Sequence, residues 1–157
     1  MTPLNSTWVI WFHNPTDDNW ELTSYMRLGE IDSIESFWDI YMRLTQNTIQ
    51  EGMFFLMKKG VEPLWENDSN INGGCWSYKV SKKEAYKSWL DLSITTCCET
   101  LIQDFSKLNG ISISPKKLFC ILKIWNNDSA YSNKTTISNV YNLNKDNCIY
   151  KSHKDRH

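Results

Sequence analysis

The sequence predicts a single α+β domain in which a mainly antiparallel β-sheet carries two to three helices. Its 157 residues suit one domain and can bury one hydrophobic core. Short β-type runs bounded by turn residues recur along the chain, and segments with helical spacing interrupt them. Helices added to an antiparallel sheet usually gather on one of its faces, and this arrangement defines the α+β class.

The N-terminal half is expected to supply strands around one helix. Ser33 is a typical helix cap, and the apolar residues after it follow at i, i+3, i+4 and i+7, which predicts a helix over residues 34–44. A turn-rich loop at 13–19 separates the first two expected strands. The strands are expected at residues 8–12, 20–28, 52–58 and 75–80, with a long loop at 61–72.

The C-terminal half is expected to hold the longest helix and a hairpin. Ser81-Lys82-Lys83-Glu84 is a capping box, which predicts a helix over residues 82–108 that ends at Asn109-Gly110. The other expected elements are a hairpin of residues 111–114 and 118–125, a weak helix at 135–143 and a last strand at 148–150. Residues 1–6 are expected to form a short N-terminal arm and residues 152–157 a loose tail.

Composition excludes several classes of protein. The net charge of −1 argues against a broad nucleic-acid backbone binder, although a few lysines can still form a small anion site. We expect no transmembrane helix and no secretory signal, because neither pattern occurs. Five cysteines without a Cys-x-x-Cys pair indicate reduced thiols and a cytoplasmic protein. The excess of lysine, asparagine and isoleucine indicates an A/T-rich genome, such as that of a protist or a large DNA virus.

The motifs of common enzymes are missing, so we expect a protein that is not an enzyme. No P-loop, Gly-x-Ser-x-Gly, Gly-x-Gly-x-x-Gly or His-Glu-x-x-His sequence occurs, and no zinc-ligand spacing is present. Cys97 and Cys98 fall within the expected long helix, where buried thiols are more common than nucleophiles. We therefore expect no catalytic residue, no metal and no cofactor.

The exposed aromatic residues favour a recognition function. Trp65-Glu66 lies in the long loop, where an indole can stack on a flat base while the carboxylate accepts two N–H groups from a guanine edge. Trp20 follows a turn-rich loop, so two indoles can sandwich one base. A positively charged base such as 7-methylguanine would gain cation–π attraction. Spacing alone favours the other interpretation, in which both tryptophans pack inward.

Seven motifs together resemble the translation initiation factor 4E family, the messenger-RNA cap-binding proteins. They are Thr-Trp-Val-Ile-Trp-Phe (7–12), Trp20, Ile-Glu-Ser-Phe-Trp-Asp-Ile-Tyr (34–41), Gly-Val-Glu-Pro-Leu-Trp-Glu (60–66), Asn-Gly-Gly-Cys-Trp (72–76), Trp-Leu-Asp (89–91) and Lys-Ile-Trp (123–125). The resemblance covers nearly the whole chain, and it implies a sheet curved like a cupped hand with the helices on its convex face.

The resemblance also implies a site for the 7-methylguanosine cap, with 7-methyl-GTP as a minimal ligand. Trp20 and Trp65 would sandwich the base, Glu66 would accept the guanine N–H groups, and Trp125 would contact the methyl group. For the phosphates, Lys116 falls where the family has an arginine, with Lys117 beside it. The second phosphate lysine of the family aligns on Ile121, and Lys123 is proposed as its substitute because it shares a strand face with Trp125.

A second site is implied on the helical side. There the family receives a helical Tyr-x-x-x-x-Leu-hydrophobic segment from scaffold factor 4G or from inhibitory 4E-binding proteins. The residues implied in partner binding are Pro3, Leu4, Ile34, Trp38, Leu90, Asp91 and Ile94. Trp38 fits a core position of the helix equally well on spacing alone. The protein is expected to be a monomer without membrane contact, located in the cytoplasm or, for a viral protein, in that of the host.

Departures from the family pattern leave two functions open. Thr2 and Asp91 replace a histidine and a glutamate of the partner site, Cys75 replaces an arginine, and the C-terminal region is shorter than in typical members. The first function is recruitment of capped mRNA for translation initiation through a scaffold. The alternative is a cap-binding competitor or regulator that does not engage cellular scaffold factor 4G.

Overall fold

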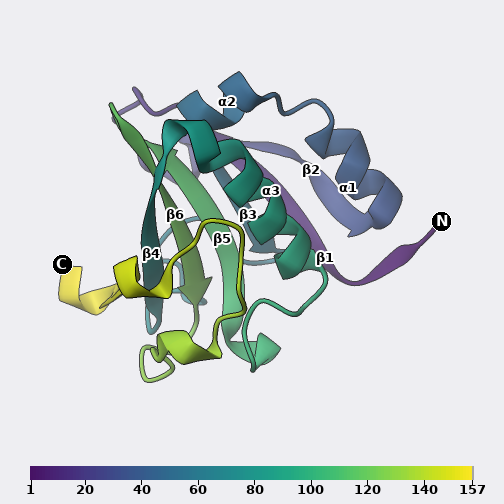
Figure 1. Cartoon of the computed structure of the whole chain (residues 1–157). Helices are drawn as coiled ribbons and strands as arrows, with labels where there is room; N and C mark the ends of the chain where they lie inside the picture. Colours follow the sequence, from purple (N-terminus) through teal and green to yellow (C-terminus); the bar gives the residue numbers. More distant parts are fainter. Residues whose placement is uncertain (157) are drawn as a thin grey trace.

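The computed structural model describes residues 1–156, in which seven antiparallel strands form one sheet (Figure 1). The strand order is β2-β1-β3-β5-β6-β4-β7. The strands are β1 (Pro3–His13), β2 (Tyr25–Ser33), β3 (Met53–Lys58), β4 (Gly74–Ser81), β5 (Leu108–Pro115), β6 (Phe119–Asn126) and β7 (Ile149–Ser152). The α-helices are α1 (Ile34–Tyr41), α2 (Gln46–Glu51) and α3 (Lys82–Cys97).

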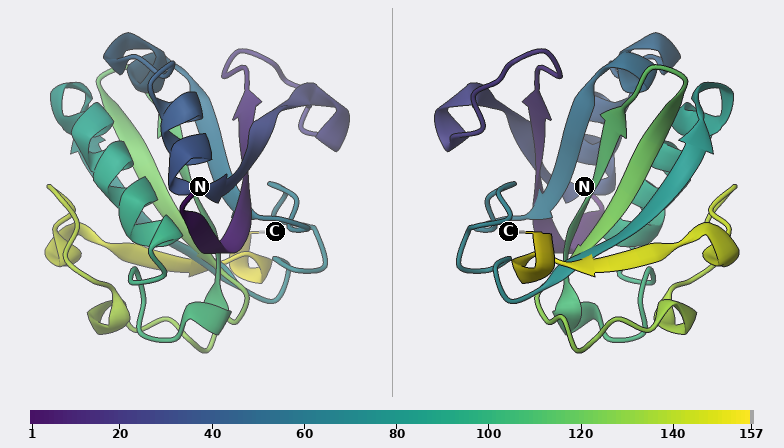
Figure 2. Two further views of the ribbon diagram at one scale, coloured as in Figure 1. Left: turned by 90° about the vertical axis from the view of Figure 1, so that its right-hand side faces the viewer. Right: turned by 90° about the vertical axis from the view of Figure 1, so that its left-hand side faces the viewer.

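All three α-helices lie on one face of the curved sheet, which we call the dorsal face (Figure 2). Helix α3 packs against β1, β4, β5 and β6, whereas α1 packs against β2. The opposite side of the sheet is called the ventral face. The prediction of an α+β fold with a curved antiparallel sheet and helices on one side is therefore confirmed.

Both predicted helix caps are present. The Ser33 hydroxyl accepts a hydrogen bond from the Ser36 backbone N–H at 3.0 Å, and the Ser36 hydroxyl reciprocates by accepting from the Ser33 N–H. Ser81 accepts from the Glu84 N–H at the start of α3. Helix α1 ends at Tyr41 rather than at residue 44.

The predicted helix over residues 82–108 is wrong beyond Cys97. The chain leaves α3 through Glu99, whose φ of 61° is left-handed, and it becomes strand again at Leu108. Leu101 and Ile102 have helical spacing, but they are buried from an irregular segment, and Ile102 forms a β-bridge with Ile137.

Two further element predictions are also wrong. The weak helix at 135–143 is limited to one 3-10 turn, Lys134–Thr136. The second strand spans Tyr25–Ser33 instead of residues 20–28, because residues 14–24 form a loop with a 3-10 turn at Leu22–Ser24. Strand β1 begins five residues before its predicted start, whereas β3, β4, β7 and the β5–β6 hairpin lie within three residues of their predicted positions.

The predicted arm is mostly part of the sheet, and the predicted tail begins in the sheet and continues into a 3-10 turn; residue 157 of that tail lies outside the described residues. Strand β1 begins at Pro3, which pairs with Ser33, so the arm over residues 1–6 is wrong from Pro3 onward. Ser152 belongs to β7, and His153 is fully buried, so the prediction of a loose tail fails for both. The His153 N–H donates to the Gly73 carbonyl at 2.9 Å. Gly73 also permits close packing against β6, because a Cβ there would lie 1.9 Å from the Asn126 carbonyl oxygen.

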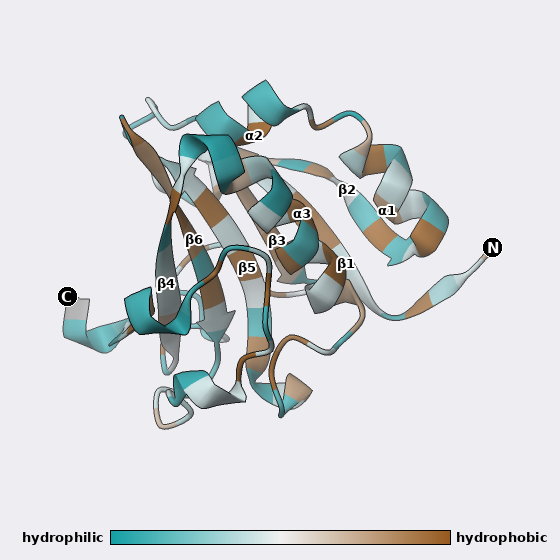
Figure 3. Ribbon diagram, viewed as in Figure 1, coloured by the Kyte–Doolittle hydropathy of each residue, from teal (hydrophilic) through white to brown (hydrophobic). Residues whose placement is uncertain are grey.

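The tryptophans divide between two apolar clusters and two open surfaces. The main core, between the dorsal face and the helices, contains Trp8, Trp76 and Trp89. A smaller ventral cluster contains Trp125, with Trp11 and Trp65 packed against it. Trp20 and Trp38 are 51% and 41% exposed. Figure 3 shows hydrophobic residues recurring along the strands and along the helices that cover them. Among residues 1–156, no helix is both long and apolar enough for a membrane span.

Candidate functional site

The ventral face carries a pocket of about 230 Å³, which we call the ventral pocket. It is lined by Trp20, Tyr25, Met53, Phe55, Pro63, Leu64, Trp65, Glu66, Ser112, Ser114, Lys123 and Trp125. The structure thus brings together Trp20, Trp65, Glu66 and Trp125, the four residues that the sequence assigned to base recognition. They come from three separate parts of the chain, and the strand order places them around one opening.

Trp20 stands on the loop after β1 and is held from behind by a histidine. The rings of Trp20 and His13 are stacked, with centroids 4.2 Å apart and an interplanar angle of 13°. His13 is fully buried, and its Nε2 lies 2.7 Å from the Asn19 carbonyl, which can only accept the hydrogen bond. One indole face is therefore covered by His13, while the exposed side chain borders the pocket.

The loop that carries Trp65 and Glu66 is organised by a buried amide pair. The side-chain amide of Asn70 donates to the carbonyls of Glu62 and Leu64 at 2.9 and 2.8 Å. Its carbonyl oxygen accepts from the side-chain amide of Asn109, at 2.8 Å. Asn109 also donates to the Ser69 carbonyl, at 2.7 Å. The long loop is thereby fastened to β5, which limits the positions that Trp65 can take.

Asn109 reaches the loop because it occupies a β-bulge. The register of β5 against β6 shifts between Leu108 and Gly110, so Asn109 is the extra residue. The prediction that Asn109-Gly110 ends a helix is therefore wrong. Gly110 is required by close packing of β5 on β3, since a Cβ there would lie 2.5 Å from the Leu56 carbonyl oxygen.

Trp125 forms the floor of the ventral pocket in a fixed orientation. Its indole Nε1 donates to the Ser112 hydroxyl at 3.0 Å, and the ring meets Phe55 edge-on. His153 packs behind it, with ring centroids 5.3 Å from Trp125 and 6.5 Å from Trp65. The Sγ atom of Cys75 lies 4.0 Å from His153 Nε2. The C-terminal segment therefore supports the floor and one wall of the pocket.

Glu66 contributes an exposed carboxylate to the rim, with a half-buried tyrosine nearby. Burial, together with the negative charge of Glu66, raises the pKa of Tyr25 to about 12. Tyr25 therefore stays a neutral hydrogen-bond donor at neutral pH. It also contacts the rings of His13 and Phe55, so it links the Trp20 side of the pocket to its floor.

The three predicted phosphate lysines occupy different places. Lys123 lines the ventral pocket. Lys116 and Lys117 are exposed at the tip of the β5–β6 hairpin and do not line it. Lys123 is thus the lysine of this group that the structure places at the pocket wall.

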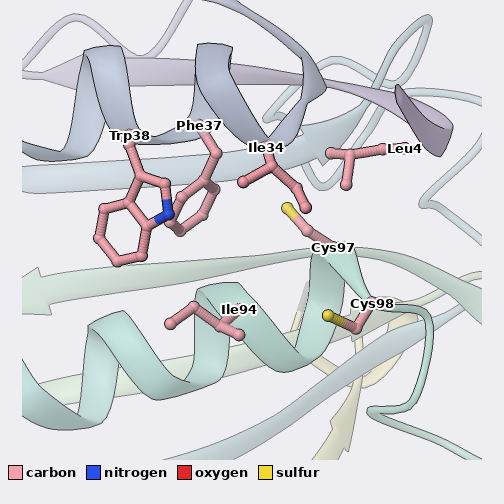
Figure 4. A pocket seen from close by; sticks show the side chains of 7 residues that line it. All are labelled: Leu4, Ile34, Phe37, Trp38, Ile94, Cys97 and Cys98. Carbon is pink, nitrogen blue, oxygen red and sulfur yellow. The ribbon is translucent and has the colours of Figure 1, made fainter. Parts of the chain in front are cut away.

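The dorsal face carries an apolar hollow of about 180 Å³ between α1 and α3, which we call the dorsal groove. Ile34, Phe37 and Trp38 of α1 face Ile94 and Cys97 of α3 across it, with Leu4 at one end and Cys98 beside Cys97 (Figure 4). Of the predicted partner residues, Leu4, Ile34, Trp38 and Ile94 line this groove. Pro3 does not line it.

Leu90 and Asp91 border a neighbouring hollow that shares Ile94 with the dorsal groove. One carboxylate oxygen of Asp91 accepts the backbone N–H of Tyr141, at 2.8 Å. The segment around Tyr141 is further attached to α3, because Ser88 donates to the Tyr141 carbonyl and the Tyr141 hydroxyl donates to Glu84. The region predicted as a weak helix is therefore a strap along α3, and it engages Asp91 within the chain.

The Cys97 thiol of the dorsal groove has the properties of a structural cysteine, whereas Cys98 is exposed instead of buried as predicted. Cys97 ends α3 and Cys98 follows it, so neither lies in the middle of a helix as predicted. Burial, and secondarily the neighbouring Cys98, raises the pKa of Cys97 to about 12. Its thiolate, the reactive form, is therefore scarce at neutral pH. Within residues 1–156, no group of three or more His, Cys, Asp or Glu side chains is placed to hold a metal ion.

Sequence reasoning missed the residues that support the ventral pocket. His13 and His153 were placed beside a turn and in the tail, and Asn70 had no role. The only available signal was the polar character of Asn70 and Asn109 near apolar stretches, which does not identify a buried pair. The contact between Asn70 and Asn109 joins residues 39 positions apart in the chain, which local sequence patterns do not reveal.

The fold is α+β, with an aromatic pocket on one face of its curved sheet and an apolar groove between the helices on the other. This combination defines a recognition domain with two binding surfaces. The family model "Eukaryotic initiation factor 4E" matches residues 3–157. The chain belongs to the eukaryotic initiation factor 4E family. Eukaryotic translation initiation factor 4E of Candida albicans is 28% identical over 145 residues, covering 86% of this chain and 69% of that protein.

Solved structures of the same fold agree with this assignment. A complex of C. elegans eIF4E-3 with the 4E-binding protein Mextli superimposes with a TM-score of 0.83 and 20% identity, covering 99% of this chain and 95% of that chain. A crystal structure of Ascaris suum eIF4E-3 with m7G cap gives a TM-score of 0.74 and 21% identity, covering 83% of this chain and 76% of that chain. These similarities establish the fold.

Proposed function

We propose that the ventral pocket binds the 7-methylguanosine cap of mRNA and that the protein recruits capped mRNA for translation initiation. The observation that carries the proposal is the convergence of Trp20, Trp65, Glu66 and Trp125 on one opening. A flat, positively charged base fits this set of groups. It can stack on indole rings with cation–π attraction while a carboxylate accepts its N–H donors.

Each residue has a distinct role in the proposal. The methylated base lies between Trp20 and Trp65, Glu66 accepts the guanine N1 and N2 hydrogens, and Trp125 contacts the methyl group from the floor. Lys123 is the nearest cation for the first phosphates, and Lys116 and Lys117 at the hairpin tip would contact phosphates further out. No metal or cofactor enters this proposal, since it requires recognition without bond breaking. The m7G cap in the Ascaris suum relative supports the choice of ligand.

Titration of the intact protein with 7-methyl-GTP, followed by tryptophan fluorescence, tests the cap site. Saturable quenching by 7-methyl-GTP and little response to GTP are expected, because only the methylated base carries the charge. Trp65→Ala should weaken binding roughly 5- to 150-fold, since stacking of one base contributes about 1–3 kcal/mol. Trp38→Ala, on the dorsal face, is the matched control and should bind 7-methyl-GTP normally. Equal affinity of the wild-type protein for both nucleotides would overturn the cap proposal.

For the dorsal groove we propose a helical partner segment with the Tyr-x-x-x-x-Leu-hydrophobic pattern, from a scaffold factor 4G or a 4E-binding protein. The groove is open and apolar, and Trp38 presents an exposed ring at its edge. The binding of Mextli by the C. elegans relative supports a partner of this class.

The strap over α3 favours the second candidate function, a cap-binding competitor or regulator that does not engage cellular scaffold factor 4G. Asp91 would be the acceptor for a partner peptide, and one of its oxygens already accepts the Tyr141 N–H. A peptide that needs both carboxylate oxygens would have to displace the strap, which weakens its net binding. The short reach of aspartate acts in the same direction.

Binding of a scaffold-type helical peptide, measured by calorimetry, separates the two functions. If the protein is an initiation factor, the peptide binds, and Trp38→Ala weakens it by roughly 30-fold or more, as expected for an interface hot spot of at least ~2 kcal/mol. Trp65→Ala is the matched control, because it removes an indole from the opposite face. Absence of peptide binding by a protein that still binds 7-methyl-GTP would favour the competitor.

A further inference from the structure

The ventral face continues beyond the ventral pocket as a surface whose charged residues are all basic. In an antiparallel sheet, directly paired residues point to the same side. The register pairs Trp125 with Cys75, Cys75 with Lys151, and Lys123 with Ser77. Since Trp125 is on the ventral face, Cys75, Lys123, Ser77 and Lys151 share that face.

Other contacts agree with this assignment of faces. Trp76 and Tyr150, which alternate with Cys75 and Lys151, form a ring contact within the main core on the dorsal side. Lys79 stands two residues beyond Ser77 on the ventral side, and its ammonium lies 4.2 Å from the centre of the Phe119 ring. Lys79 and Lys151 are both exposed.

The charge of this surface is opposite in sign to that of the whole protein. The ventral positions of β5, β6, β4 and β7, all within the described residues, are Gly110, Ser112, Ser114, Phe119, Ile121, Lys123, Trp125, Cys75, Ser77, Lys79, Ser81, Ile149 and Lys151. They include three lysines and no acidic residue, whereas the chain has a net charge of −1. Asp146, which precedes β7, lines one hollow together with Lys79 and Ile149 and marks the border of the basic surface.

The surface also has the composition of a single-strand binding surface. Such surfaces combine cations for phosphates with aromatic or apolar groups for bases. Here Phe119, Ile121 and Ile149 lie between the lysines, and serine hydroxyls supply additional donors. In residues 1–156, neither Lys79 nor Lys151 takes part in an ion pair. Strands β6, β4 and β7 are adjacent, so the surface spans about 10 Å from the pocket wall to the sheet edge at the usual strand spacing.

We propose that the RNA chain that follows the cap crosses this β6-β4-β7 surface, with its phosphates at Lys79 and Lys151. The proposal rests on the proposed cap site, because Lys123 lines the ventral pocket and begins the surface. The ligand is a single-stranded phosphodiester chain. Its repeated negative charges complement the three lysines, since the ventral strand positions around them carry no carboxylate. Base identity is not read, because side chains that could pair with base edges are few there.

The test compares 7-methyl-GTP with a 7-methylguanosine-capped, unstructured RNA of ten nucleotides, on the wild-type protein and on Lys79→Glu/Lys151→Glu. The wild-type protein should bind the capped RNA more tightly than 7-methyl-GTP. The double variant should lose roughly tenfold in affinity for the capped RNA and none for 7-methyl-GTP. The plot of log affinity for capped RNA against log salt concentration should become shallower by about 1.4 for the double variant. This is ~0.7 for each of the two phosphate contacts that it loses on a single strand.

Controls separate this proposal from the proposed cap function. Arg43→Glu/Lys83→Glu makes the same change in net charge at exposed positions outside the ventral face and should bind capped RNA normally. The neutral pair Lys79→Gln/Lys151→Gln should show a smaller loss than the glutamate pair. An uncapped RNA of the same sequence reports on the surface alone, so its response to the double variant would survive a failure of the cap site.

Three results would overturn the proposal. The first is an unchanged affinity of the double variant for capped RNA. The second is a parallel loss of 7-methyl-GTP binding in both the glutamate and the glutamine pairs, which would show that these lysines act through the pocket or through folding. The third is stronger competition by an aspartate-rich peptide than by uncapped RNA, which would assign the surface to an acidic protein partner.

Discussion

Replacement of Glu66 by alanine is expected to lower the affinity for 7-methyl-GTP by roughly 10²- to 10³-fold. In the proposed complex the carboxylate accepts two N–H groups of a cationic base, and a hydrogen bond to a charged group contributes about 1.5–3 kcal/mol. The two hydrogen bonds together would contribute the lower part of twice this range, because Glu66 is exposed and water competes for its carboxylate. Glu66→Gln should lie between the wild type and Glu66→Ala, since the amide keeps one acceptor and loses the charge.

Asp68→Asn is the matched control for this experiment. Asp68 lies on the same loop and is also exposed, so the substitution removes the same charge two residues away. It should leave 7-methyl-GTP binding within about twofold, because an exposed carboxylate that makes no contact with the base interacts with it only weakly through water. If Asp68→Asn lost as much affinity for 7-methyl-GTP as Glu66→Gln, the effect of Glu66 would come from the overall charge of the loop and not from hydrogen bonds to the base.

Asn70→Ala is expected to lower both the stability of the protein and its affinity for the cap. The substitution removes three hydrogen bonds, two to loop carbonyls and one from Asn109. At about 1 kcal/mol each, their loss costs roughly 3 kcal/mol in the free energy of unfolding. The loop would then leave its position on β5. Ordering Trp65 again when the cap binds would cost free energy and weaken the affinity. Denaturant unfolding and 7-methyl-GTP titration measure the two effects.

Asn72→Ala provides the comparison for Asn70→Ala. It is an asparagine of the same loop whose side chain is exposed, so its replacement should change the free energy of unfolding by no more than ~0.5 kcal/mol. Saturating 7-methyl-GTP should partly restore the stability of Asn70→Ala, because a ligand that binds only the folded state stabilises it. Equal stability of the two variants would contradict a structural role of the Asn70–Asn109 pair.

The parts of the fold that the sequence predicted correctly are those decided by local interactions. Ser33 and Ser81 were recognisable as caps, because a cap hydroxyl satisfies N–H groups within three residues of itself. The β5–β6 hairpin was recognisable from alternation on both sides of a proline-lysine turn. Trp65-Glu66 was recognisable as a loop motif because it lies in a segment without periodicity; Glu66 is exposed as predicted, whereas Trp65 is partly buried against the ventral cluster.

The errors arose where distant contacts decided the conformation. Leu101 and Ile102 continue the apolar spacing of α3, but β-pairing with residue 137 and burial in the main core hold them in an irregular segment. Asn109, followed by Gly110, is typical of the end of a helix, but in the structure it is the extra residue of a β-bulge. The polar segment after Lys151 gave no sign that His153 lies beneath two tryptophans.

By itself, the sequence determined the fold class, because caps and strand runs depend on residues close together in the chain. Its resemblance to the initiation factor 4E family indicated the four residues that meet in the ventral pocket. The tertiary structure alone decided how those residues are held: His13 behind Trp20, His153 behind Trp125, and Asn70 fastened to Asn109. It also decided that Lys123, Lys79 and Lys151 share one face. The physical reason is that strand pairing joins residues far apart in the chain, and the register of that pairing depends on the packing of the whole sheet.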